Sequence, residues 1–292
     1  MRKWLLTTLA LLLVLGFTAA CGSPANPADQ TAAQGTGQQG AAQQGTAEQD
    51  TGQAAGRSID KIKERGKLIV GVFTDKPPFG MTDEKGNYIG FDTDLAKRFA
   101  KDLLGDESKI EFVPVEPASR IPFLQSDKVD IIVANMTITD DRKEAVDFTN
   151  PTMKVATQIL VKEDSGVQTI DDLKGKDVIV TKGTTADIYL TENYPEINLI
   201  KFDKNSEALQ ALKDGRGIAY AQDNFILIAW AKKNPGYVLL PEKLEEGLIA
   251  PAVKKGNTEL RDWVNEELKK LAQEKFLLQL YDKYVKDELG EV

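Results

Sequence analysis

Residues 129–143 read VDIIVANMTITDDRK, and this stretch decides the fold. It opens with an apolar run typical of a buried strand, passes through a polar turn, and continues into a short helix that Thr139 can cap. The same order returns at residues 177–187, DVIVTKGTTAD. A strand, a polar turn and a helix form the repeating unit of α/β proteins, so the two stretches predict that class.

The pattern extends outward from these two stretches over most of the chain. Alternating strands and helices predict parallel sheets, with ligands at the carboxyl ends of the strands. Because the N–H groups that start a helix attract anions, two such turns in two separate units indicate a ligand held between two lobes. Further strands are expected at 67–73, 110–115, 155–161, 199–202, 218–222, 238–240 and 248–253. Further helices are expected at 58–66, from Asp92 or Asp94 to Leu104, and at 121–126, 206–212 and 224–232, with two more within 258–284. Residues 75–79 contain two prolines and are expected to form a loop.

The composition excludes several classes of function. The chain has 292 residues, a formal charge of −8, no histidine and one cysteine. An acidic chain has no broad electrostatic reason to bind nucleic acid, so none is expected as a partner. The absence of histidine excludes histidine-based catalysis and most metal sites, and no metal or cofactor is expected. It also predicts nearly flat ligand affinity between about pH 5.5 and 7.5.

The N-terminus has the pattern of a secretory signal. Arg2 and Lys3 precede an apolar run from Trp4 to Phe17, and small residues follow up to Cys21. The sequence TAAC resembles a bacterial lipoprotein box, which predicts a signal peptide at 1–20 and a lipid on Cys21. The alternative is an uncleaved anchor helix, for which the apolar run is short.

The segment that follows is predicted to be a tether. Residues 22–56 contain no Val, Ile, Leu, Met or aromatic residue. Such a segment cannot bury enough apolar surface to offset the entropy of ordering it. Residues 21–57 are therefore expected to be a disordered linker between a lipid anchor and the globular part.

Seven motifs, in fixed order, resemble one known family. They are GVFTDKPPFG (71–80), GFDTDLAK (90–97), RIPFLQ (120–125), VDIIVANMTITDDRK (129–143), VDFTNP (146–151), DLKGK (172–176) and KGTTAD (182–187). Together they are similar to the family-3 extracellular solute-binding proteins of polar amino-acid ABC transporters. Within that family the chain most resembles the cysteine-binding lipoproteins.

The resemblance implies a two-lobe, clamshell fold of the type II periplasmic-binding-protein kind, with two hinge strands. It places lobe 1 at 58–156 together with 247–292, and lobe 2 at 157–246. Ligand binding would favour a closed state through contacts to both lobes. The implied partners are a small amino acid, an ABC permease and its ATPase, and a membrane reached through the lipid, with the protein itself a monomer on the extracytoplasmic face.

The resemblance also supplies candidates for the two charged ends of an amino acid. Arg142 is expected to bind the α-carboxylate, because a guanidinium matches a carboxylate with two hydrogen bonds. Asp223 is expected to bind the α-ammonium. From the residues alone, the pattern favours a solvated Arg142 in the first turn of its helix, and Asp223 fits a helix cap as well as a binding residue; the resemblance favours the binding roles. The Thr137 hydroxyl and the Asn135 carbonyl would add hydrogen bonds, and Thr184 and Thr185 would offer amides or hydroxyls to the carboxylate.

The residues around the ligand side chain are less constrained by the motifs. Phe73 and Lys76 border the first loop, where the family has apolar or aromatic walls. Arg120 would meet the ligand side chain, or would be a surface residue at a helix start. Where the family often has glycine this chain has Asn135, whose side chain would intrude on the pocket.

Three classes of function follow. The first is delivery of a polar amino acid to a permease, with cysteine favoured and aspartate, glutamate or glutamine as alternatives. The second is a dehydratase-like enzyme on the same fold, although no poised catalytic acid is evident. The third is a surface receptor that keeps the clamshell and signals to a partner. The first predicts a protein that is not an enzyme.

Overall fold

The computed structural model describes residues 59–286. The predicted signal peptide (1–20), the lipid site at Cys21 and the tether (21–57) lie outside the described residues. Within residues 59–286, no helix combines the length and the apolar character needed to cross a membrane.

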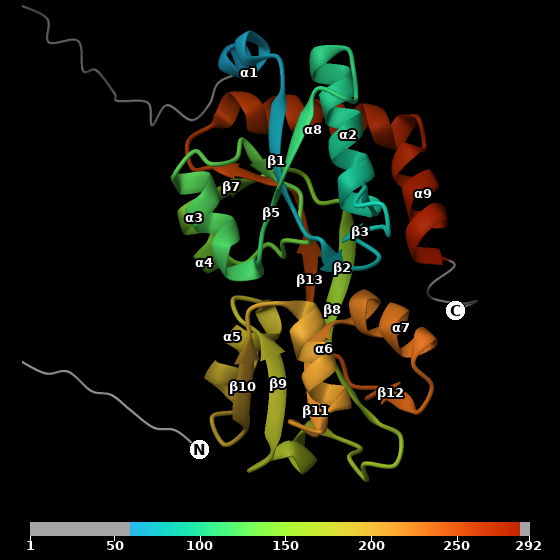
Figure 1. The fold of residues 1–292 in the computed structure, drawn as a ribbon. Helices are drawn as coiled ribbons and strands as arrows, with labels where there is room; N and C mark the ends of the chain where they lie inside the picture. The colour runs from blue at the N-terminus through green and yellow to red at the C-terminus, as the bar shows by residue number, and fades with distance from the viewer. Residues whose placement is uncertain (1–58, 287–292) are drawn as a thin grey trace, which may run out of the picture. The chain divides into compact units, whose positions relative to one another are not determined.

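Most of the helices lie where the sequence periodicity predicts them (Figure 1). The α-helices are α1 (Ile59–Arg65), α2 (Phe91–Leu104), α3 (Arg120–Gln125), α4 (Asp140–Ala145), α5 (Thr185–Asn193), α6 (Asn205–Lys213), α7 (Asn224–Lys233), α8 (Thr258–Gln273) and α9 (Phe276–Tyr281). Short turns of other helical types are η1 (Pro117–Ser119), η2 (Ile170–Leu173) and η3 (Asp282–Lys286).

Lobe 1 is built on the sheet β5-β1-β6-β14-β7. Its strands are β1 (Leu68–Val72), β5 (Ile110–Pro114), β6 (Ile131–Ile132), β7 (Val146–Phe148) and β14 (Ala252–Lys254). Strand β1 lies parallel to β5 and β6, and all of its residues are buried. One apolar cluster joins this sheet to α2 and α8, and a second cluster joins it to α3, so helices cover both faces.

Lobe 2 is built on the sheet β10-β9-β11-β8-β12. Its strands are β8 (Met153–Lys162), β9 (Asp177–Thr181), β10 (Asn198–Phe202), β11 (Ala219–Asp223) and β12 (Tyr237–Leu239). Alternate residues of β9 point to opposite faces: Val178 and Val180 join a cluster with α5, whereas Ile179 joins a cluster with α6 and α7. The predicted α/β class is therefore confirmed in both lobes.

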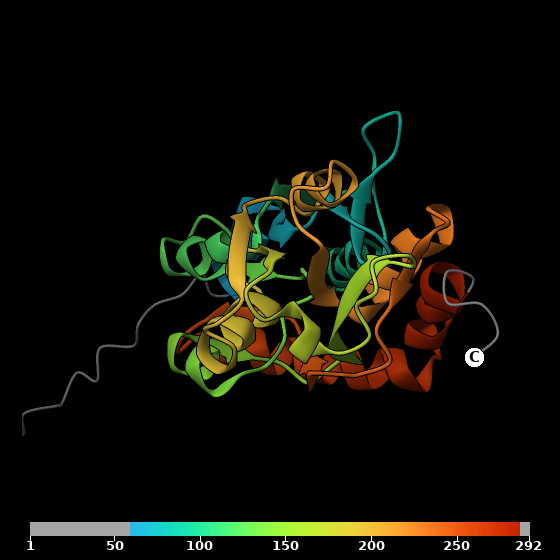
Figure 2. The ribbon, with the colours of Figure 1, turned by 90° about the horizontal axis from the view of Figure 1, so that it is seen from below.

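Two strands carry the chain between the lobes. Strand β8 leads from lobe 1 into the second sheet, and β13 (Glu245–Ile249) leads back to β14. The two strands pair antiparallel from Thr157 opposite Glu245 to Met153 opposite Ile249. They run between the two sheets in Figure 1, and Figure 2 shows the molecule from below, where the elements of the two lobes overlap.

Four details of the predicted secondary structure are wrong. The strand expected over 129–135 shortens to β6, and the strand expected over 248–253 divides into β13 and β14. Residues 75–79 are not all loop, because β2 (Asp75–Lys76) pairs with β3 (Gly80–Thr82), which pairs with β4 (Tyr88–Ile89). The sheets are not wholly parallel: β7, β8, β12 and β14 are paired antiparallel. Strands β7, β12 and β14 lie next to the strands that carry the chain between the lobes, or pair with β8, which is one of them. Because no strand–helix–strand unit connects these pairs, nothing requires them to be parallel.

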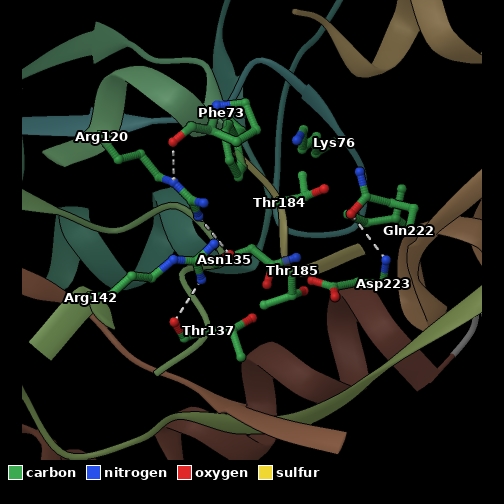
Figure 3. Close-up of a pocket in the computed structure, with 12 residues that line it drawn as sticks. Phe73, Lys76, Arg120, Asn135, Thr137, Arg142, Thr184, Thr185, Gln222 and Asp223 are labelled. Atoms are coloured by element: carbon green, nitrogen blue, oxygen red, sulfur yellow. Dashed lines mark hydrogen bonds between the residues drawn. The ribbon is translucent and has the colours of Figure 1, made fainter. Parts of the chain in front are cut away.

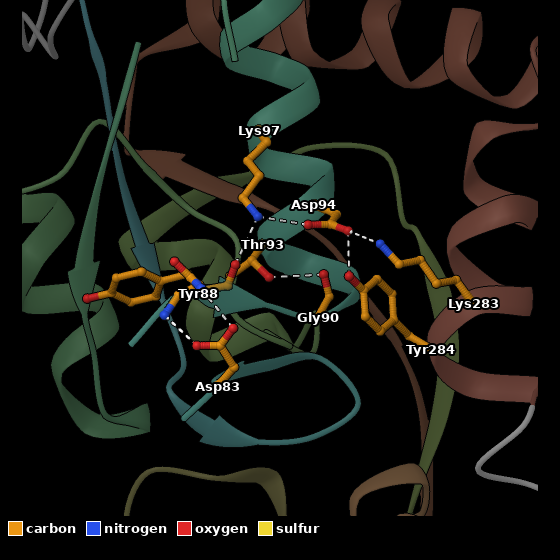
Figure 4. Close-up of polar contacts among 9 residues, drawn as sticks. Asp83, Tyr88, Gly90, Thr93, Asp94, Lys97, Lys283 and Tyr284 are labelled. Atoms are coloured by element: carbon orange, nitrogen blue, oxygen red, sulfur yellow. Dashed lines mark hydrogen bonds and ion pairs between the residues drawn. The ribbon is translucent and has the colours of Figure 1, made fainter. Parts of the chain in front are cut away.

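Neither Asp92 nor Asp94 caps α2, whose N-cap is Gly90. Asp94 instead joins α2 to the C-terminal part of lobe 1 (Figure 4). Its Oδ1 accepts a hydrogen bond from Lys97, and its Oδ2 accepts from Lys283 at 2.8 Å and from the Tyr284 hydroxyl. This carboxylate therefore fixes η3 against the start of α2.

Candidate functional site

A small cavity lies between the two lobes. The volume open to the centres of water-sized molecules is about 10 Å³, roughly what a single water needs, so the cavity is nearly closed in this structure. All the binding residues predicted from the sequence line it, together with three that were not predicted (Figure 3). The lining residues are Phe73, Lys76, Pro117, Arg120, Asn135, Thr137, Arg142, Thr184, Thr185, Gln222, Asp223 and Ile226. Figure 3 shows the two arginines on one side and the Gln222–Asp223 pair on the other.

Arg142 is placed by the turn that starts α4. Thr139 caps this helix, as predicted, because its Oγ1 accepts the Arg142 N–H at 3.3 Å. The guanidinium donates from Nη1 to the Thr137 carbonyl at 2.7 Å and from Nη2 to the Gly183 carbonyl of lobe 2 at 3.0 Å. Burial lowers the pKa of Arg142, but a guanidinium stays charged. Among the described residues none accepts from its Nε, so the guanidinium keeps donors for an anion in the cavity.

Arg120 holds lobe 1 together rather than extending freely into the cavity. It is 3 % exposed, and it donates to the carbonyls of Pro117, Ala134 and Asn135 at 3.0–3.1 Å. Its Nη2 also reaches the Gly183 carbonyl at 3.4 Å. Burial and the neighbouring Arg142 lower its pKa. Four of its five N–H groups are thereby committed to backbone carbonyls, which leaves little for a ligand side chain.

Thr184 and Thr185 differ in what they can offer. The Thr184 hydroxyl donates to the Thr181 carbonyl at 2.7 Å and accepts the Asp187 N–H at 3.2 Å, so it serves as the N-cap of α5. Thr185 is the first residue of that helix, and its hydroxyl lies 3.4 Å from the Thr157 hydroxyl. The first N–H groups of a helix lack intrahelical acceptors, so the Thr185 amide is available to an anion in the cavity.

Lys76 and Phe73 form one end of the cavity. Lys76 is 1 % exposed, and its Nζ lies 4.2 Å from the centroid of the Phe73 ring. No described residue accepts a hydrogen bond from this ammonium group. Burial lowers the pKa of Lys76 to about 7, because desolvation disfavours the charged form.

Asp223 lies across the cavity from the two arginines, at the end of β11 (Figure 3). It is the N-cap residue of α7 by position, but its side chain makes no capping hydrogen bond. The alternative interpretation, a helix-capping carboxylate, is therefore wrong. Burial raises the pKa of Asp223, while Asn135, Lys76 and Arg142 act against that rise. The carboxylate is thus held in an apolar setting with cations nearby, as a partner for a buried ammonium group must be.

Asn135 has an unusual backbone conformation. Its φ of 39° lies in the left-handed region, where non-glycine residues are uncommon, and its N–H donates to Asp92 Oδ2 at 2.7 Å. Its carbonyl accepts from Arg120, whereas its side-chain Oδ1 is buried without a partner. The acceptor still open to a ligand is therefore this side-chain oxygen, in addition to any second bond to the carbonyl.

Two acidic residues near the site were not predicted to matter. Burial raises the pKa of Asp92 to about 7 and that of Glu116 to about 7. Asp92 lies in the first turn of α2, where the sequence suggested only a cap. Glu116 precedes η1, and its buried Oε2 has no partner. Desolvation can thus move the pKa of a carboxyl or lysine group into the range where histidine titrates, so the absence of histidine does not by itself exclude titration near neutral pH.

The cavity suits a small ligand with both charges. Its lining contains the cations Lys76, Arg120 and Arg142 and the anion Asp223. Within residues 59–286 no cluster of three metal-ligating side chains occurs. The arrangement can neutralise a carboxylate at Arg142 and the start of α5, and an ammonium at Asp223.

Known proteins resemble the chain over most of its length. The family model described as bacterial extracellular solute-binding proteins, family 3, matches residues 68–287. The ABC transporter glutamine-binding protein GlnH of Bacillus subtilis (strain 168) is 38 % identical over 232 residues, which are 79 % of this chain and 85 % of that protein. The L-cystine-binding protein TcyJ of Escherichia coli (strain K12) is 31 % identical over 229 residues, 77 % of this chain and 85 % of that protein.

Solved structures resemble the chain over a similar extent. The cysteine-binding protein from Campylobacter jejuni has a TM-score of 0.78 and 50 % identity, covering 80 % of this chain and 94 % of that one. The solute receptor for L-cysteine of Neisseria gonorrhoeae has a TM-score of 0.78 and 46 % identity. The likeness covers 80 % of this chain and 95 % of that one. An ancestral amino acid-binding protein, AncCDT-1, described as a precursor of cyclohexadienyl dehydratase, has a TM-score of 0.72 and 38 % identity, covering 78 % and 99 %.

These likenesses confirm the predicted fold class, a two-lobe α/β fold of the type II periplasmic-binding kind. All seven motifs quoted from the sequence fall within the matched range. The chain belongs to the bacterial extracellular solute-binding proteins of family 3.

Proposed function

We propose that this protein captures one free amino acid outside the cytoplasm and delivers it to an ABC permease. The observation that carries the proposal is that Arg142 of lobe 1 and Asp223 of lobe 2 line the same cavity. Both side chains are 6 % exposed. A cation and an anion from opposite lobes match the two charges of a zwitterion.

The energetics favour such a ligand. An α-carboxylate or an α-ammonium buried without a partner would cost several kcal/mol. Arg142, aided by the Thr185 amide, would bind the carboxylate, and Asp223, aided by Asn135 Oδ1, would bind the ammonium. Because these groups belong to both lobes, the ligand would favour the state in which the lobes are in contact.

Cysteine is the ligand we favour. The two solved cysteine binders are 50 % and 46 % identical to this chain, whereas GlnH is 38 % identical. Lys76 and Phe73 line one end of the cavity, and the ligand side chain would end there. The cations Lys76 and Arg120 disfavour a ligand such as arginine, which would add a third positive charge. Glutamine is the alternative that GlnH supports, and aspartate or glutamate is the alternative that the cations support.

We propose that the protein binds its ligand without converting it. An enzyme on this fold would need an acid in contact with the substrate. Glu116 has the raised pKa of such an acid, but it does not line the cavity, and Asp223 would be paired with the ligand ammonium. The ancestral neighbour AncCDT-1 is itself described as an amino acid-binding protein.

We further propose the remaining features that the sequence suggests. They are a lipid on Cys21 that anchors the protein to the extracytoplasmic face of the membrane, a tether over 21–57, and a monomeric state. We place the lobe limits at 58–156 with 247–292 and at 157–246, because β8 and β13 carry the two crossings of the chain.

A thermal-shift screen of the twenty amino acids and cystine, with cysteine kept reduced, tests the proposal. Cysteine should raise the melting temperature most, and calorimetry should show weaker binding for the variants Arg142→Ala and Asp223→Asn. Failure of every amino acid to raise the melting temperature would refute the proposed function. A larger shift with glutamine than with cysteine would refute the ligand assignment alone.

A further inference from the structure

Asp75 of lobe 1 makes two hydrogen bonds to lobe 2. Its carbonyl accepts from Asn205 Nδ2 at 2.9 Å, and its carboxylate Oδ2 accepts from the Ser206 backbone N–H at 2.8 Å. Both donors belong to the first turn of α6. Asp75 precedes Lys76 in the chain but does not itself line the cavity.

The second of these bonds supplies α6 with a cap. The N-cap residue of α6 is Lys204, and it makes no side-chain capping bond. By contrast, α5 is capped by Thr184 and α8 by Asn257, each of which directly precedes its helix. The N–H groups at a helix start are unsatisfied and carry partial positive charge, so a carboxylate there is favourable. Helix α6 therefore receives its cap from the other lobe.

A chain of buried hydrogen bonds connects the other bond, from Asn205 to the Asp75 carbonyl, to the cavity. Asn205 is 1 % exposed, and its Oδ1 accepts from the Tyr220 hydroxyl at 2.7 Å. That hydroxyl accepts from Gln222 Nε2 at 2.9 Å, and Gln222 Oε1 accepts from the Asp223 N–H at 3.0 Å. Gln222 and Asp223 both line the cavity. Networks of this kind fix side-chain positions, because a broken bond leaves a buried polar group unsatisfied.

We propose that Asp75 is a positioning residue for ligand binding: it caps α6 from the opposite lobe when the lobes meet, and through Asn205 and Tyr220 it fixes the Gln222–Asp223 pair at the ligand. The inference rests on the proposed function, because it concerns the affinity of the same cavity. The cap exists only while the lobes are in contact. Its free energy therefore adds to that of the ligand in holding them together.

Conservative and non-conservative substitutions of Asp75 distinguish this role from direct contact with the ligand. Asparagine caps helices about as well as aspartate, whereas alanine does not. Asp75→Ala should weaken cysteine binding about fivefold, mostly through faster dissociation, and Asp75→Asn should restore most of the affinity. If Asp75 instead acted on the ligand through its charge, Asp75→Ala and Asp75→Asn would lose affinity equally, because both remove that charge.

A capping carboxylate confined to one lobe provides the control. Asp172 Oδ2 accepts the N–H groups of Gln168 and Thr169 at 3.0 and 2.9 Å, all within lobe 2. Asp172→Ala should lower the melting temperature of the ligand-free protein and leave the dissociation constant for cysteine unchanged. Asp75→Ala should raise the dissociation constant for cysteine and leave the melting temperature of the ligand-free protein unchanged.

Calorimetry, stopped-flow dissociation and small-angle X-ray scattering of the full chain measure these effects. With saturating cysteine, Asp75→Ala should show a larger radius of gyration than wild type. Equal dissociation constants for wild type and Asp75→Ala, or an equal loss in Asp75→Ala and Asp75→Asn, would overturn the inference. If wild type binds no amino acid, the proposed function fails. The inference then fails with it, because no ligand affinity is left for the cap to support, whereas equal dissociation constants in a wild type that does bind overturn the inference alone.

Discussion

Gly183 in lobe 2 lies so close to Ala118 in lobe 1 that a Cβ atom on Gly183 would be 2.9 Å from the Ala118 Cα. The contact is between backbones, so neither side can move away cheaply. The Gly183 carbonyl also accepts hydrogen bonds from Arg120 and Arg142. The absence of a side chain at this position is therefore what allows the lobes to approach.

Gly183→Ala should weaken amino-acid binding at least tenfold, because the added methyl group keeps the lobes apart. The substitution also places alanine at a φ of 73°, which costs about 1–2 kcal/mol of stability. Gly175→Ala is the matched control, since Gly175 has a φ of 71° and no atom within 4 Å of its Cβ position. Both variants should lose stability in urea titrations, but only Gly183→Ala should lose affinity in calorimetry. Equal affinities for the two variants would contradict the steric argument.

Arg142→Ala should weaken amino-acid binding by at least about 2 kcal/mol, as expected for a buried charged contact. Arg142→Lys keeps the charge but cannot form the guanidinium fork, so it should recover only part of the loss. Isothermal titration calorimetry measures both. An unchanged affinity in Arg142→Ala would remove this arginine from the site.

Lys76 should give the folding stability a pH dependence. The unfolded chain holds the Lys76 proton up to its ordinary pKa of 10.5, whereas burial makes the folded chain release it at about 7. Between these values the unfolded state binds more protons, so the free energy of unfolding should rise with pH. Lys76→Met should remove this rise and should be more stable than wild type below about pH 7, where the folded protein must bury the charge.

Urea titrations of the ligand-free protein between about pH 6 and 9 measure this effect. The exposed Lys176 supplies the control, because Lys176→Met removes a lysine without emptying a buried site. Its pH profile should parallel that of wild type. A Lys76→Met profile that still rises as steeply as wild type would show that other groups carry the dependence.

Gly247, in the crossing strand β13, should control the position of Thr137. A Cβ atom on Gly247 would lie 2.6 Å from the Thr137 Cγ2 methyl, and the Thr137 carbonyl holds the Arg142 guanidinium. Gly247→Ala should therefore lower ligand affinity, and adding Thr137→Ser, which removes that methyl, should restore it. A double-mutant cycle by calorimetry tests the coupling. Additive losses in the two single variants would show that the contact has no effect on binding.

The sequence predicted the local elements well because they depend on local chemistry. The Thr139 cap of α4 and the strand–turn–helix at Thr184 follow from residue type and apolar periodicity, and both occur as expected. The family resemblance also identified nine of the twelve residues that line the cavity, because it carries information about tertiary structure.

What the sequence could not predict depends on contacts between distant segments. Asp75 and Ser206 are far apart in the chain, and no local pattern indicates that one caps the helix of the other. The committed donors of Arg120 and the raised pKa of Asp92 likewise arise from burial against other elements. The expectation of flat affinity near neutral pH rests on the absence of histidine and stays a prediction, and a buried carboxyl with a raised pKa, such as Asp92, is the kind of group that would contradict it.

The paired strands β8 and β13 determine where the affinity of this molecule can be adjusted. Their backbone hydrogen bonds run across the ribbon and join the two strands to each other, so bending the ribbon along its length need break none of them. The linker between the lobes therefore contributes little to the balance between spread and gathered arrangements. That balance is left to a handful of groups that meet across the gap, and single substitutions there can retune ligand retention while the interior of each half stays as it is.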